Sequence, residues 1–178
     1  MSFTELLFKK TCESHKTVDK HPFVSLIKNN KLASDLYIAF NKICIDETQK
    51  TLILQDINLQ NKLHKNLENL EEEYINHPIF LTSSSFNILL NHCKKYPLET
   101  EYMFKLGLMK GGNILKKYVD SCHHDFLTFI DPNTLCNNFK HYLNTNIHPL
   151  EQESFIIHVN DAYKLIKLCF DDFFNVYK

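Results

Sequence analysis

The glycines of this chain are concentrated in one short segment. Three glycines serve 178 residues, and all lie within six positions, at Gly107, Gly111 and Gly112. The segment sits inside a helical pattern of apolar residues, where each glycine costs about 1 kcal/mol relative to alanine. This loss of helix stability indicates that the helix kinks, or that a flat or closely packed group lies against its backbone. Close packing of another helix on small residues is an alternative explanation.

One histidine near the N-terminus is placed to bind a metal. The chain has ten histidines, and a lone histidine is more often a surface or satisfied core residue than a ligand. His15 differs because Leu7, Thr11 and Val18 lie at helical spacings from it and form an apolar side. A neutral imidazole there can point into the bundle and ligate iron.

The elements that must position these residues are predicted to be helices. Only five prolines and three glycines interrupt the chain, and apolar residues recur mainly at helical spacing. Ser2 and Glu5 have the spacing of a capping box, and Pro132 suits a first helical position. The predicted helices cover about residues 2–19, 22–28, 32–77 as two helices, 83–96, 99–119, 132–142 and 149–177.

Composition restricts the class of protein. The chain is 44% hydrophobic and 23% charged with a net charge of -1, which is typical of a globular protein and gives no support for nucleic-acid binding. All twenty basic residues are lysine, so an anion must be held by lysine or by hydroxyl groups. The sequence has no leader pattern and no apolar run of membrane-spanning length. We therefore expect one cytoplasmic domain over residues 1–178 without a membrane anchor.

Two segments of the chain resemble a known family. ELLFKKTCESHKTVDKHPFV and YMFKLGLMKGGNILKK resemble the proximal and distal helix motifs of heme oxygenases, and FLTFIDPNTL, FKHYL and DAYKLIKLCFDDF continue the likeness in the same order. Residues 32–96 match only in helical character. The resemblance implies an all-α, single-domain heme oxygenase-like bundle, with heme between the first helix and a glycine-kinked distal helix.

The resemblance also assigns residues to the heme. His15 matches the proximal iron ligand, and Asp19 matches an acidic residue near it. Gly107 and Gly111 match the glycines whose missing side chains let the distal helix lie against the heme face.

Further positions match the edge of the heme pocket. Tyr102 and Lys140 match residues that contact the heme propionates, and Lys9 lies one residue out of register with a third such position. Phe126 and Phe170 match aromatic residues of the pocket region.

The chain departs from the family pattern at two positions. Leu108 stands where many members carry an aspartate that orders water beside iron-bound dioxygen, and leucine forms no side-chain hydrogen bond. Asn144 stands where the family often has an arginine that fixes a propionate.

The resemblance implies an enzyme that opens heme. Heme is both cofactor and substrate, O2 is the co-substrate, a separate reductase or ferredoxin supplies electrons, and the products are biliverdin, carbon monoxide and ferrous iron. A heme carrier, sensor or sink without turnover is the alternative that Leu108 favours. The same scaffold with another ligand, or a pure interaction module, explains less of the glycine cluster and of His15.

Overall fold

The computed structural model describes residues 1–47 and 76–177, and the regular structure in these ranges is helical. The elements are α1 (Phe3–Asp19), α2 (Pro22–Ile27), α3 (Lys31–Asp46), α5 (Ile79–Thr82), α6 (Ser84–Lys95), α7 (Pro97–Thr100), the π-helix η2 (Glu101–Lys105), α8 (Leu106–Leu115), the 3-10 helix η3 (Ser121–His123), α9 (Pro132–Asn146) and α10 (Pro149–Tyr177). The all-helical expectation is confirmed. The second helix expected within residues 32–77 lies outside the described residues.

Two helix starts form as the sequence predicts. In α1 the Ser2 hydroxyl accepts the Glu5 backbone N–H at 3.3 Å, and the Glu5 carboxylate accepts the Ser2 N–H at 2.7 Å. Helix α9 begins at Pro132, after Asp131 in a left-handed conformation whose carboxylate accepts the Thr134 N–H. Pro132 suits this position because the first helical residue needs no amide donor.

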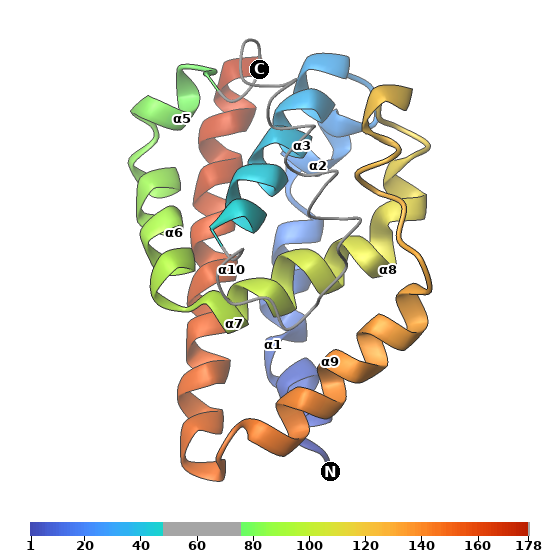
Figure 1. The fold of residues 1–178 in the computed structure, drawn as a ribbon. Helices are drawn as coiled ribbons and strands as arrows, with labels where there is room; N and C mark the ends of the chain where they lie inside the picture. Colours follow the sequence, from blue (N-terminus) through green and yellow to red (C-terminus); the bar gives the residue numbers. More distant parts are fainter. Residues whose placement is uncertain (48–75, 178) are drawn as a thin grey trace.

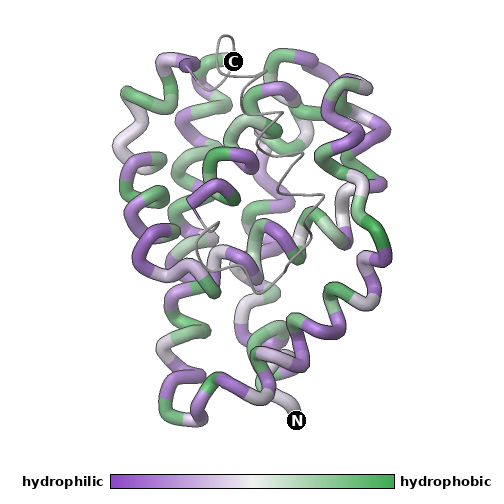
Figure 2. The backbone as a smooth tube through the Cα atoms, viewed as in Figure 1, coloured by the Kyte–Doolittle hydropathy of each residue, from purple (hydrophilic) through white to green (hydrophobic). Residues whose placement is uncertain are grey.

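Helix α10 is the central support of the bundle. It extends along the molecule and packs against α1, α2, α6 and α7, while α8 runs away from it and packs against α9 (Figure 1). Hydrophilic and hydrophobic residues alternate along the helices, as expected for amphipathic elements around a shared core (Figure 2). Within the described residues, no helix has the length and apolar character needed to span a membrane.

An aromatic core joins α2, α3 and α10. The ring centroids of Phe23 and Phe170 lie 5.1 Å apart, and those of Phe40 and Phe173 lie 5.4 Å apart. All four rings are buried, and burial of such side chains dominates core energetics. The core fixes α3 relative to α10, and Phe40 and Phe170 present one side to the cavity described below.

The helix that carries the glycines is irregular before them. Residues Glu101–Lys105 form a π-helical turn, whereas Gly107, Gly111 and Gly112 all lie in the regular helix α8. The Lys105 ammonium donates to the Glu101 carboxylate at 3.0 Å, and both side chains are buried. Insertions of this kind occur often near functional sites. The irregularity therefore precedes the first glycine, and the glycines themselves continue as α-helix.

Candidate functional site

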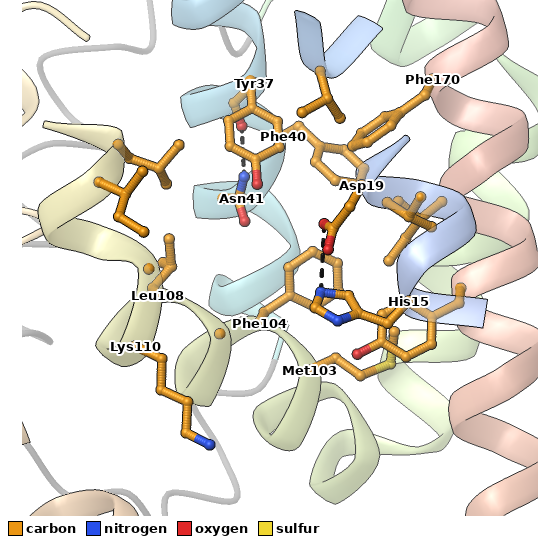
Figure 3. A pocket seen from close by; sticks show the side chains of 18 residues that line it. His15, Asp19, Tyr37, Phe40, Asn41, Met103, Phe104, Leu108, Lys110 and Phe170 are labelled. Atoms are coloured by element: carbon orange, nitrogen blue, oxygen red, sulfur yellow. Dashed lines mark hydrogen bonds and ion pairs between the residues drawn. The ribbon is translucent and has the colours of Figure 1, made fainter. Parts of the chain in front are cut away.

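A cavity of about 480 Å³ lies between α1, α3, α8 and α10 (Figure 3). Its volume is that of a small-molecule or cofactor site. The walls are mostly apolar and carry a few polar side chains. The lining residues are His15, Val18, Asp19, Val24, Tyr37, Phe40, Asn41, Met103, Phe104, Gly107, Leu108, Lys110, Gly111, Ile114, Leu115, Tyr163, Ile166 and Phe170.

The three glycines have two different roles. A Cβ placed on Gly112 would lie 2.7 Å from the backbone oxygen of Leu127, so this glycine allows the loop to approach α8. A Cβ on Gly107 or Gly111 would meet no atom within 4 Å, and both residues line the cavity. Gly112 thus serves close packing, while Gly107 and Gly111 leave bare backbone facing open space.

Helix α1 places an imidazole and a carboxylate on the other side of the cavity from α8 (Figure 3). His15 Nε2 lies 3.5 Å from an Asp19 carboxylate oxygen one helical turn later, and the His15 ring lies 5.3 Å from the ring of Tyr163. The His15 side chain is 51% exposed, because it borders the cavity instead of the packed core. The ring is therefore oriented by a carboxylate and accessible to a ligand.

Helix α3 contributes the polar part of the cavity wall. The Asn41 amide donates to the Tyr37 backbone oxygen at 2.8 Å, and the Tyr37 hydroxyl points toward the space between α1 and α8 (Figure 3). Burial raises the pKa of the Tyr37 phenol, although the Asn41 amide opposes the shift. The phenol stays protonated near neutral pH. Across the cavity, Leu108 is buried and offers no polar atom.

Lys110 is the lysine that lines the cavity. Its side chain extends from α8 away from Tyr37 and Asn41 (Figure 3). Burial, followed by the nearby charge of Lys140 on α9, lowers the pKa of Lys110. Lys140 does not itself line the cavity, but it lies beside a residue that does.

The structure brings together part of the predicted site. His15, Asp19, Gly107, Gly111, Leu108 and Phe170 line one cavity. Tyr102 and Lys9 do not line it, and the Tyr102 ring packs on Phe155 at a centroid distance of 6.5 Å. Phe126 is fully buried outside the lining, with the Lys42 ammonium 5.1 Å above its ring.

The second departure from the family pattern has a structural role. The Asn144 side-chain oxygen accepts the backbone N–H of Thr4 at 2.9 Å. This hydrogen bond joins α9 to the first turn of α1. Asn144 is thus engaged in holding two helices together, away from the residues that line the cavity.

Four polar residues of the cavity lining were not predicted from the sequence, namely Tyr37, Asn41, Lys110 and Tyr163. Tyr37 and Asn41 could have been identified from the sequence, because two polar residues four positions apart interrupt an otherwise apolar helix face. Lys110 carried a signal as well, because it lies one residue before Gly111. Tyr163 had none, because an aromatic residue on a long amphipathic helix is ordinarily a core residue.

Comparison with solved structures confirms that this chain has the all-helical heme oxygenase fold. The heme oxygenase-1 of the cyanobacterium Synechocystis, solved in complex with heme, superposes with a TM-score of 0.77 at 16% identity, covering 99% of this chain and 96% of that one. The heme oxygenase of Leptospira interrogans superposes with a TM-score of 0.73 at 18% identity, covering 96% and 98%. No protein-family model and no curated protein matches the sequence.

Proposed function

We propose that the chain binds heme between α1 and α8 and cleaves it with O2 and reductant to biliverdin, carbon monoxide and ferrous iron. The observation that supports this most is the bare backbone of Gly107 and Gly111 in the cavity that His15 borders. A planar macrocycle fits between an imidazole and a helix face without side chains. The Synechocystis protein of the same fold is described with heme bound.

His15 and Asp19 fit the role of an iron ligand and its supporting group. A metal-bound histidine usually donates its other ring N–H to a carboxylate, which fixes the tautomer and the orientation of the ring. The 3.5 Å contact between His15 and Asp19 provides such a carboxylate. When bound, heme supplies both the iron that activates O2 and the ring that is opened.

The α8 wall of the cavity determines how closely a ligand can approach and how much bulk water enters. Gly107 and Gly111 allow the helix backbone to approach the macrocycle. Met103, Phe104 and Leu108 are buried apolar residues on the same wall, and they exclude bulk water from this part of the cavity. A dry wall of this kind protects reactive species from side reactions.

Tyr37 and Asn41 supply the hydrogen-bonding groups that Leu108 lacks. The Tyr37 hydroxyl can donate to an ordered water, and the Asn41 side-chain oxygen can accept from one while its amide nitrogen donates to the Tyr37 backbone oxygen. Together they hold water on the α3 wall and pass protons into the cavity. Electrons come from a separate reductase or ferredoxin.

The test begins with hemin binding. Hemin added to the purified protein is expected to give a Soret band that is lost or strongly shifted in His15→Ala. It should be unchanged in His141→Ala, because His141 is exposed on α9 and outside the cavity. Ascorbate or a reductase in air, with catalase present, should then convert the bound heme to biliverdin and carbon monoxide.

Two results would contradict the proposal. Heme that binds through His15 but survives reductant and oxygen would make the chain a binder without turnover. A spectrum that is the same in wild type, His15→Ala and His141→Ala would remove the assigned ligand, and with it the proposed site.

A further inference from the structure

We infer that Asn160 of α10 is a positioning residue, which holds Ser14 of α1 and so sets the direction of the neighbouring His15 imidazole. The inference rests on the proposed function, because it concerns the residue assigned to the iron. Asn160 lies outside the cavity lining, so it acts on the site through the first helix and not through contact with a ligand.

Helix α1 lies along α10, and the two helices run in the same direction (Figure 1). At the start of α1, Phe3 packs on Phe155 with ring centroids 5.4 Å apart. Just after the end of α1, His21 Nε2 lies 2.6 Å from an Asp171 carboxylate oxygen. Asn160 makes a contact between these two, at the level of the proposed iron ligand.

The Asn160 amide uses both of its ends on α1. Its side-chain oxygen accepts the Ser14 hydroxyl at 2.7 Å, and its nitrogen donates to the Lys10 backbone oxygen at 3.2 Å. The carbonyl can accept this hydrogen bond in addition to the one within the helix, because its oxygen has two lone pairs. An aspartate here would lack the donor, and an aliphatic side chain would lack both groups. The two contacts are one helical turn apart, so together they fix how α1 is rotated relative to α10.

The rotation of α1 about its own axis decides where the His15 ring points. The buried side of this helix includes Leu7, Thr11 and Val18. At 3.6 residues per turn, Ser14 and His15 lie on opposite borders of this buried stripe. A rotation of about 10° moves a side-chain tip by about 1 Å, because a helix with its side chains has a radius of about 5–6 Å. Holding Ser14 therefore holds His15 at the edge of the cavity.

Apolar packing defines this rotation less sharply than a hydrogen bond does. Burial of the stripe is favourable over a range of angles, because the hydrophobic effect is non-directional. The bond from Ser14 to Asn160 requires a particular direction, and its 2.7 Å length is typical of a hydroxyl donor. Three residues after Asn160, on the same face of α10, Tyr163 packs on the His15 ring at 5.3 Å. One face of α10 thus holds both the imidazole and the residue before it.

The test compares Asn160→Ala with Asp172→Ala. Asp172 also lies on α10, and its carboxylate accepts the Ser83 hydroxyl at 2.6 Å, so Asp172→Ala removes a comparable contact away from α1. Asn160→Ala is expected to weaken hemin binding about tenfold, because two hydrogen bonds that orient the ligand's helix are lost. Asp172→Ala should bind hemin within about twofold of wild type, even where urea unfolding shows an equal loss of stability.

A second readout reports the imidazole directly. In resonance Raman spectra of the ferrous complex, the iron–histidine stretching band should shift or broaden in Asn160→Ala and stay unchanged in Asp172→Ala. Ser14→Ala should cause the same kind of change. The double variant of Ser14 and Asn160 should lose less affinity than the sum of the two single variants, because both remove one shared hydrogen bond. Ser14→Thr keeps a hydroxyl, and it should recover most of the affinity that Ser14→Ala loses.

An Asn160→Ala protein with the hemin affinity and the iron–histidine band of wild type would overturn the inference and leave His15-dependent heme binding intact. The same band shift in Asp172→Ala would also overturn it, because the effect would then follow from stability alone. Absence of hemin binding by the wild type would overturn the proposed function and this inference together.

Discussion

The side chains around the cavity differ in chemistry from one helix to the next. Helix α1 presents an imidazole beside a carboxylate, and α3 presents a phenol beside an amide. Helix α8 presents the bare backbone of Gly107 and Gly111, the buried side chain of Leu108 and, between the two glycines, Lys110. The proposed function assigns the imidazole to the iron, the phenol and amide to ordered water, and the bare glycine backbone to the face of a flat ring.

Tyr37 is the residue whose loss should separate binding from chemistry. In Tyr37→Phe the ring packing is kept and only the hydroxyl is removed, so hemin affinity should change little. We expect the rate of heme conversion in a single turnover to fall about tenfold or more, because a proton donor beside the ligand is lost. The measurement is the decay of the Soret band after a reductant is added in air.

Tyr118→Phe provides the control for this prediction, since Tyr118 is an exposed tyrosine outside the cavity lining. A Tyr37→Phe protein that converts heme as fast as wild type would show that water in the cavity is ordered without the phenol.

At the scale of elements, the glycine-containing helix makes two different contacts within two turns. Gly112 faces the loop at Leu127, and the other two glycines face the cavity. The π-helical turn before them carries Met103 and Phe104, and both side chains line the cavity. Helix α8 is thus both a packing surface for the Leu127 loop and a wall of the cavity.

The two kinds of glycine give opposite predictions for stability. Gly112→Ala should lower the free energy of unfolding by about 1–3 kcal/mol, because its Cβ would overlap the Leu127 backbone. Gly111→Ala should raise the stability of the heme-free protein by up to about 1 kcal/mol, because alanine favours the helix and its Cβ meets no atom. The same change should weaken hemin binding, because the methyl group enters the cavity.

Urea unfolding of the heme-free proteins and hemin titration measure these effects. Equal destabilisation by both substitutions would show that Gly111 also packs closely. Hemin binding to Gly111→Ala as tight as to wild type would show that the ligand does not approach this part of α8.

At the scale of the whole molecule, a buried polar cluster joins α3 to η3, the short helix that follows α8 in the chain. The Lys42 ammonium lies 3.5 Å from His123 Nδ1, and His123 Nε2 lies 3.1 Å from an Asp35 carboxylate oxygen. Asp35 and Lys42 come from α3 and His123 from η3, and all three are buried. The cluster therefore connects α3 to η3 in the interior of the fold, and its charge state affects the stability of the whole molecule.

Because Lys42 is buried, the free energy of unfolding changes with pH in the alkaline range. Burial lowers the pKa of Lys42 from 10.5 to about 8. The unfolded chain then binds more protons than the folded chain between these two values, so the free energy of unfolding rises with pH in this window. Below pH 8 the buried Lys42 ammonium is charged in the folded protein, and its desolvation lowers the free energy of unfolding by the full amount. Relative to Lys42→Met, wild type should gain about 1–3 kcal/mol as the pH rises through the window.

Chemical unfolding of wild type and Lys42→Met at several pH values between neutrality and the upper end of this window measures the change. Lys117→Met, an exposed lysine, should follow wild type at each pH. A difference between wild type and Lys42→Met that stays constant with pH would show that Lys42 keeps an ordinary pKa in the folded protein.

The sequence alone determined the helical class, several helix boundaries and the position of the glycines within a helix. The capping box at Ser2 and Glu5, the start of α9 at Pro132 and the glycines of α8 were readable because capping, proline geometry and glycine preference act within a few residues. The resemblance then placed His15, Asp19, Gly107 and Gly111, which the structure brings to one cavity.

Only the tertiary structure decided how these surfaces are used. It separated Gly112 from the cavity glycines, placed Lys110 beside Lys140, turned Tyr37 and Asn41 into the cavity, and kept Phe126 and Tyr102 out of its lining. The physical reason is that each of these roles depends on which face of a helix meets a segment distant in sequence. Local rules fix where a helix begins and ends, and packing in the shared core fixes which of its faces is buried, paired or open to a ligand.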